Sequence, residues 1–143
     1  MRLALNILVV VVGLLMLVLG VQWLTDPTAA AARLGIALHG ADAFSTARGD
    51  MAGMFIGGAL MALFGLLTRN NAWLLALALM LALIAAGRVV GFYLDGPATL
   101  SVQTFFAELV MAAVLVLKAT QAPKPNPTEA TRPEDHMVSS QGT

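Results

Sequence analysis

Two side chains of opposite charge, Arg88 and Glu108, interrupt the most apolar part of this sequence. Arg88 stands in GRVVGFYLDG, directly after AWLLALALMLALIAA, and Glu108 stands within TLSVQTFFAELVMAAVLVL. A guanidinium in apolar surroundings can hold an anion in a two-point contact, and a carboxylate there can transfer a proton. One such charge alone at the middle of a bilayer costs at least about 2.5–3.5 kcal/mol. We therefore expect Arg88 and Glu108 to pair.

Other polar residues are expected close to this pair. Ser101, Thr104 and Glu108 share one helix face, because their spacings are three and four. Together with charged residues at the outer membrane surface, they predict a polar pocket that opens outward, with the ion pair at its floor. The candidate ligand-binding residues are Arg88, Glu108, Arg48, Asp50, Asp95, Gln103 and Thr104.

The composition indicates that these residues are positioned by membrane-spanning helices. The chain has 143 residues, of which 59% are hydrophobic and 11% are charged, whereas soluble domains carry about 25% charged residues. About 20 consecutive apolar residues cross the hydrocarbon as a helix. Four such spans are predicted, at about 3–24, 50–68, 72–94 and 99–117. The predicted fold is an all-α, antiparallel four-helix bundle over 1–118, followed by a disordered tail at 119–143 that is rich in proline.

The connections between the spans set their order in space. Only RNN joins the second span to the third, and only DGPA joins the third to the fourth, so consecutive spans should be antiparallel neighbours. The long connection, 25–49, starts with Asp26-Pro27, which favours a helix start, and Gly35 can end that helix. We expect a short interfacial helix there, followed by an irregular stretch.

Helix geometry suggests that the two charged side chains can meet. At 1.5 Å per residue, Glu108 lies about 15 Å into its span and Arg88 lies about 9 Å from the outer end of its own. Side chains tilt toward the N-terminus of their helix, and the third and fourth spans run in opposite directions. The guanidinium and the carboxylate should therefore converge.

Small residues in the second span predict close helix contacts. Gly49, Gly53 and Gly57 recur at intervals of four, and a second seam contains Gly58, Ala62 and Gly65. Small residues often mark contact faces in membranes, because they let two backbones approach each other closely. We expect helix packing at these seams, and a dimer interface is the alternative.

The distribution of basic residues predicts the orientation. One side of the membrane would carry Arg2, Arg69, Lys118, Lys124 and Arg132, and the other Arg33 and Arg48. By the positive-inside rule both termini are cytoplasmic. In a bacterium this predicts a multi-pass protein of the cytoplasmic (inner) membrane, with Trp23 and Tyr93 in the outer aromatic belt.

Several classes of site are absent from the sequence. There is no cysteine, so thiol chemistry and cysteine-zinc sites are excluded. The motifs of serine hydrolases, zinc proteases, phosphate loops and dinucleotide sites are missing. The formal net charge is +0, which gives no indication of nucleic acid. We expect neither a metal nor a cofactor. The expected partners are the lipid bilayer, a second copy or another membrane protein, and a lipophilic or anionic small molecule.

Three short motifs carry a resemblance to a known family. RGDMAGMF in the second span, GRVVGFYLDG in the third and the lone Glu108 in the fourth resemble small bacterial membrane proteins catalogued as domain of unknown function 4345. The resemblance covers roughly 3–118 and implies a four-helix integral membrane protein without an assigned activity. The positions that match the family pattern are Arg48, Asp50, Arg88, Gly91, Asp95 and Glu108.

Three hypotheses of function remain open. The leading one is a small membrane protein, not an enzyme, whose outward pocket binds or scaffolds a lipophilic or anionic ligand or partner. The second is a proton-coupled carrier that works as an oligomer, and the third is an acid-base membrane enzyme that uses Glu108 on a lipophilic substrate. In addition, the Arg88–Glu108 pair can be a structural clamp that fixes the helix register.

Overall fold

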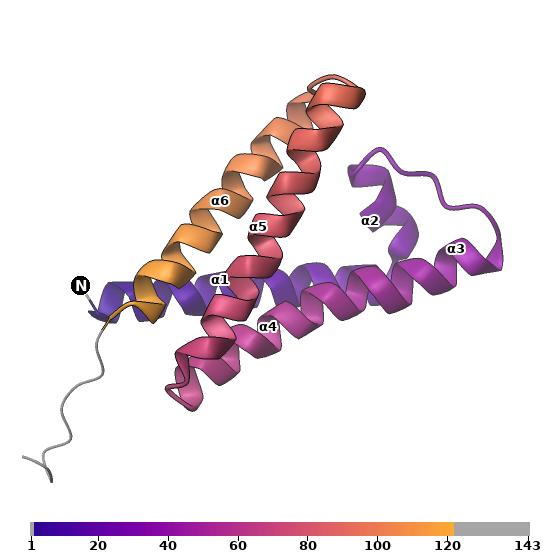
Figure 1. Ribbon diagram of the computed structural model, residues 1–143. Coiled ribbons are helices and arrows are strands. Elements are labelled where there is room, and N and C mark those ends of the chain that lie inside the picture. Colours follow the sequence, from indigo (N-terminus) through magenta and orange to yellow (C-terminus); the bar gives the residue numbers. More distant parts are fainter. Residues whose placement is uncertain (1, 122–143) are drawn as a thin grey trace, which may run out of the picture.

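The computed structural model describes residues 2–121, and this part of the chain is almost entirely helical (Figure 1). The elements are α1 Arg2–Thr25, α2 Pro27–Arg33, α3 Gly40–Thr46, a π-helical turn η1 Ala47–Met51, α4 Ala52–Leu67, α5 Asn71–Leu94 and α6 Thr99–Ala119. Four segments are long and apolar enough to cross a membrane: α1, the continuous segment Gly40–Leu67, α5 and α6. The predicted all-α membrane fold is confirmed. Residues 122–143 of the predicted tail lie outside the described residues.

The four long helices form two antiparallel pairs. α1 packs mainly on α4, and α5 packs mainly on α6. The pairs cross near the N-terminus of α1 and the α4–α5 connection, and they diverge toward α2 and the α5–α6 connection (Figure 1). The structure is therefore V-shaped, with an opening between the two pairs.

Burial follows from this arrangement. The main core lies where the pairs cross and includes Val9, Leu74, Leu77 and Leu115. Many other large apolar side chains point away from the protein, such as Leu83, which is 65% exposed. Such a surface is unfavourable in water but matches the hydrocarbon of a bilayer, because no apolar area has to be hidden from lipid.

The two predicted glycine seams of α4 differ. Gly58, Ala62 and Gly65 are buried, and an added Cβ at Gly58 would lie 2.5 Å from the sulfur of Met16. This seam lets α4 approach α1 and α5 closely. The other seam faces open space: a Cβ would meet nothing within 4 Å at Gly49, Gly53 and Gly57.

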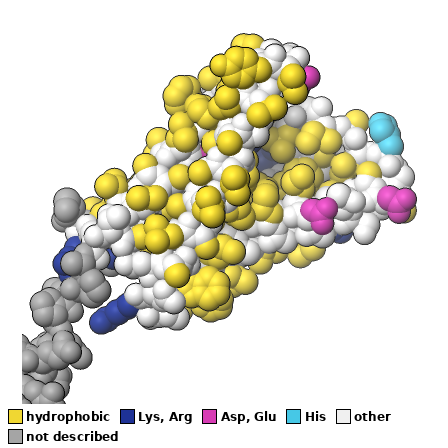
Figure 2. All heavy atoms as spheres, in the orientation of Figure 1, with side chains coloured by type: hydrophobic (Ala, Val, Ile, Leu, Met, Phe, Trp, Pro, Cys, Tyr) yellow, Lys and Arg dark blue, Asp and Glu magenta, His cyan; other side chains and the backbone are white. Residues whose placement is uncertain are grey.

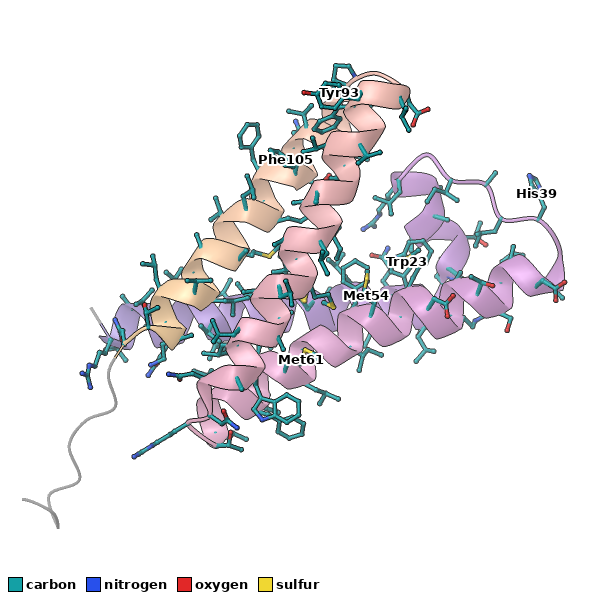
Figure 3. The ribbon with its side chains drawn as sticks, in the orientation of Figure 1. Trp23, His39, Met54, Met61, Tyr93 and Phe105 are labelled. Atoms are coloured by element: carbon teal, nitrogen blue, oxygen red, sulfur yellow. The ribbon has the colours of Figure 1, made fainter. Side chains whose placement is uncertain are left out.

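The long connection is more regular than expected. The predicted short helix is present as α2, with the Asp26 carboxylate accepting a hydrogen bond from the Ala29 amide at 3.0 Å. The predicted irregular stretch is wrong, because α3 is helical and continues through η1 into α4. α3 itself buries no residue and extends the helix from η1. In η1, Ala47 is 3% exposed and packs in a small second core with Trp23 of α1 and with α2. Trp23, labelled in Figure 3, is 4% exposed and is therefore not a membrane-facing belt residue.

Candidate functional site

A cavity of about 900 Å³ lies between the two helix pairs and is called the cleft below. Figure 2 shows it as an open hollow between α5 and the part of the protein that contains α2, with hydrophobic side chains in its walls. Its mouth is formed by Arg33 and Leu34 on one side and by Asp95 and Ala98 on the other. The cleft exists because the pairs diverge above their crossing point.

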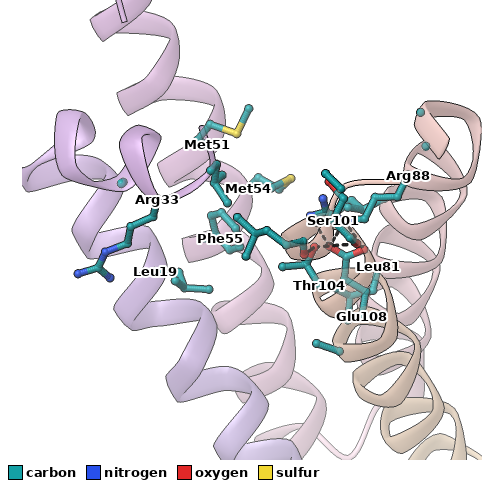
Figure 4. A pocket seen from close by; sticks show the side chains of 18 of the residues that line it. Leu19, Arg33, Met51, Met54, Phe55, Leu81, Arg88, Ser101, Thr104 and Glu108 are labelled. Carbon is teal, nitrogen blue, oxygen red and sulfur yellow. Dashed lines mark hydrogen bonds and ion pairs between the residues drawn. The ribbon is translucent and has the colours of Figure 1, made fainter. Parts of the chain in front are cut away.

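Apolar side chains make up most of the cleft surface. Met16, Leu81 and Met111 line its deep end next to the main core, and Leu19 and Phe55 line the wall from α1 and α4 (Figure 4). The polar and charged lining residues are Gln22, Arg33, Arg88, Asp95, Ser101, Thr104 and Glu108. The expected polar pocket is thus a largely apolar cleft with a few polar groups, which is the usual character of a small-molecule site.

The expected pair between Arg88 and Glu108 is present in the wall formed by α5 and α6. Arg88 Nε donates to both carboxylate oxygens of Glu108, at 2.9 and 3.0 Å, and Nη2 donates to Oε1 at 2.8 Å. Figure 4 shows these bonds as dashed lines. Glu108 is 7% exposed and is the one buried charged residue in the described range. Its charge is tolerated because the guanidinium satisfies both oxygens.

The depth of this pair differs from the prediction. Met111 is one helical turn deeper on α6 than Glu108, and Leu81 is about two turns deeper on α5 than Arg88; both line the cleft. The floor is therefore apolar, and the ion pair lies in the side wall above it. The depth of a residue along its helix could be derived from the sequence. The residues that form the floor of the cleft could not, because they depend on the angle between the helix pairs.

The α5–α6 hairpin holds the pair in register. Gly96 adopts φ 86° in the short connection, a left-handed conformation that glycine adopts without strain. At the other end of the hairpin, the side-chain amide of Asn71 donates to the last helical carbonyl of α6, Ala119 O, at 2.6 Å. The two helices are thus joined at both ends, with the ion pair between them.

Arg88 lines the cleft and keeps unused donor capacity. Its side chain is 27% exposed, and within residues 2–121 its Nη1 has no hydrogen-bond partner. Thr104, by contrast, directs its hydroxyl to backbone carbonyls of its own helix, at 2.9 Å to Leu100 O and 3.1 Å to Ser101 O. A ligand in the cleft can therefore receive a hydrogen bond from Arg88, while Thr104 offers mainly an acceptor.

Three candidate residues lie outside the cleft. Arg48 donates from Nε to Leu24 O at 3.1 Å, where α1 ends, and its guanidinium lies 5.9 Å from the Phe44 ring centre. Asp50 and Gln103 are exposed and do not line the cleft. Gln103 precedes Thr104 and so points about 100° away around α6. Of the seven candidates, the structure brings Arg88, Glu108, Thr104 and Asp95 to one cavity.

Arg33 and Gln22 line the cleft, although neither was a candidate or was expected in the pocket. Arg33 donates from Nη1 to the side-chain oxygen of Gln22 at 3.2 Å, and both residues line the cleft. The sequence contains one signal for them, because the Asp26-Pro27 start turns α2 back beside the end of α1. That turn brings together residues eleven positions apart.

The fold and the cleft define a class: a multi-pass α-helical membrane protein with a ligand-sized apolar cavity between two helix pairs. Within residues 2–121, no three His, Asp or Glu side chains gather where they could hold a metal ion. The chain belongs to the family described as domain of unknown function (DUF4345), whose model matches residues 4–118. No curated protein and no solved structure matches the chain.

Proposed function

We propose that this protein binds a lipophilic molecule in the cleft, as a small integral membrane protein rather than an enzyme. The observation that carries the proposal is the cleft itself, an apolar cavity of about 900 Å³. Ligand pockets commonly measure about 300–1,000 Å³ and are mostly apolar, with a few polar groups that orient the ligand. The cleft has both properties.

The location of the cleft favours a ligand from the bilayer. Its walls come from α1, α4, α5 and α6, which carry the four segments able to cross a membrane. An open apolar hollow in such a protein is accessible to molecules dissolved in the lipid, and apolar surface does not oppose their entry. In this proposal, Glu108 fixes the position of Arg88, and Arg88 Nη1 contacts a polar group of the ligand.

The carrier and enzyme hypotheses receive less support from the geometry. Both use Glu108 as the group that transfers a proton, and both of its oxygens accept hydrogen bonds from Arg88. A proton-transferring carboxylate has to reach its substrate or a water molecule. Glu108 would first have to leave Arg88, so we give it a positioning role.

The experiment compares two glycine substitutions in protein purified from native membrane. Gly87 lines the cleft, and an added Cβ there meets nothing within 4 Å. Gly87→Phe should therefore fill the cleft without a clash inside the protein. Gly57→Phe is the matched control, because Gly57 has equally open space but does not line the cleft.

Mass spectrometry of the small molecules that copurify provides the readout. We expect wild type and Gly57→Phe to retain a lipophilic molecule, and folded Gly87→Phe to lose most of it. Equal retention by all three proteins, or no retained molecule in wild type, would contradict the proposal.

A further inference from the structure

The mouth of the cleft carries two charged side chains that the Arg88–Glu108 pair does not use. Arg33 is the last residue of α2, on the side of α1 and α4. Asp95 is the C-cap residue of α5, on the side of the other pair. Both line the cleft. The two sides of the mouth therefore carry opposite charges.

The charge of Arg33 is not neutralised by a carboxylate in the described part of the chain. Its hydrogen bond goes to the neutral amide of Gln22, at 3.2 Å, and the single salt bridge found within residues 2–121 joins Arg88 to Glu108. Because Gln22 accepts through its oxygen, its NH₂ group can still donate. Arg33 and Gln22 thus present several donors, in a planar arrangement suited to phosphate or carboxylate.

Arg33 extends from a well-packed element. Pro27, Ala30 and Ala31 of α2 are buried, and the two alanines pack in one cluster with Trp23. Gly35, at φ 71°, then ends the helix. A donor group on a fixed helix loses less conformational freedom on binding than one on a mobile loop, which favours a defined contact.

Asp95 occupies an unfavourable position for an anion. It lies at the C-terminal end of α5, where the helix dipole is negative. Among the described residues its carboxylate has no hydrogen bond or ion pair within 4.0 Å. A cationic group placed at the mouth would offset both effects, because it would interact favourably with the carboxylate and with the end of the helix.

We propose that the ligand of the cleft is a zwitterionic amphiphile that carries a phosphate and an ammonium group. This inference rests on the function proposed above. Arg33 and Gln22 bind the phosphate, Asp95 binds the ammonium group, and the apolar chain extends toward Met16 and Leu81. A fatty acid would leave Asp95 without a partner, and an uncharged lipid would leave both sides of the mouth unpaired.

The test uses full-length protein reconstituted in nanodiscs that contain phosphatidylethanolamine and phosphatidylglycerol in equal amounts. Native mass spectrometry then measures which lipid remains bound after the disc is removed. We expect wild type to retain phosphatidylethanolamine about tenfold over phosphatidylglycerol, the ratio that about 1.4 kcal/mol of differential binding gives. Asp95→Asn should remove this preference, and Arg33→Gln should reduce retention of both lipids.

Two exposed charged residues outside the cleft supply matched controls. Asp42→Asn and Arg69→Gln make the same chemical changes where no cleft contact exists, so both should behave like wild type. Folding of each variant is checked by circular dichroism before lipid is measured.

The outcomes separate the two proposals. If wild type retains neither lipid and no other lipophilic molecule, the proposed function itself fails. A second outcome is that Gly87→Phe abolishes lipid retention, while wild type shows no headgroup preference and Arg33→Gln and Asp95→Asn have no effect. The cleft would then be a lipid site, but the zwitterionic assignment would be overturned. A preference for phosphatidylglycerol would also overturn it, since a lipid without an ammonium group cannot use Asp95.

Discussion

Arg88 on α5 contacts both carboxylate oxygens of Glu108 on α6, with three nitrogen–oxygen distances between 2.8 and 3.0 Å. The pair joins two helices and also forms part of the cleft wall. A single interaction therefore connects the stability of the α5–α6 hairpin with the shape of the candidate binding site.

Breaking this pair should destabilise the protein. Glu108→Ala leaves the Arg88 guanidinium in an apolar wall, and we expect a loss of about 3 kcal/mol in the free energy of unfolding. The measurement is unfolding of purified protein in mixed micelles with increasing SDS, followed by circular dichroism. Leu109→Ala, at a neighbouring position that is 42% exposed, is the control and should change much less.

The double variant Arg88→Met with Glu108→Met should recover most of this loss. Removing both charges also removes the unpaired guanidinium, and apolar replacements of buried ion pairs are often neutral or stabilising. A single Glu108→Ala variant as stable as wild type would refute the structural importance of the pair.

Gly20 should not tolerate even one added methyl group. A Cβ there would lie 2.6 Å from Ile56 Cγ1 and 2.9 Å from the Ile56 backbone nitrogen. Because backbone atoms cannot rotate away, we expect Gly20→Ala to cost about 1–3 kcal/mol in the same SDS assay. Gly53→Ala should be neutral or stabilising by up to about 1 kcal/mol, since its Cβ meets nothing within 4 Å and alanine favours helix. Similar losses in both variants would contradict this packing.

Arg48 should protect the end of α1. Its Nε donates to Leu24 O, one of the helix-terminal carbonyls that have no partner within the helix. Arg48→Ala should therefore increase hydrogen exchange of the amides near 21–25 by severalfold, measured by mass spectrometry in detergent. Asp50→Ala is the control, because Asp50 shares no hydrogen bond with Arg48 or α1 in the described structure. The prediction fails if the two variants exchange alike.

The orientation of the protein can be tested with single cysteines, because the natural sequence contains none. The positive-inside rule places both termini in the cytoplasm and the long connection outside. His39→Cys should react with an impermeant thiol reagent on intact cells, whereas Ser139→Cys should react only after permeabilisation. The reverse pattern would invert the assignment.

Much of the fold could be predicted because it depends on local rules. The four apolar segments require helices in lipid, where every backbone group has to be satisfied within its own segment. The short α5–α6 connection requires antiparallel neighbours, and Asp26-Pro27 starts α2. The equally short α4–α5 connection does not give such a pair, because α4 packs mainly on α1 and diverges from α5. The pairing of Arg88 with Glu108 also followed, because an unpaired charge at that depth is costly and the tilt of side chains on antiparallel helices brings the two together.

The sequence by itself therefore determined which segments are helical and which charged residues must meet, since backbone hydrogen bonding and charge burial act over a few residues or between adjacent helices. Only the tertiary structure decided that the helix pairs diverge, that the cavity between them is mostly apolar, and that Arg33 reaches it while Arg48 caps α1 instead. Those features depend on the angle between the two pairs and on which glycine seam packs. Close packing of many side chains at the crossing point sets that angle, and no single residue or spacing in the sequence specifies it.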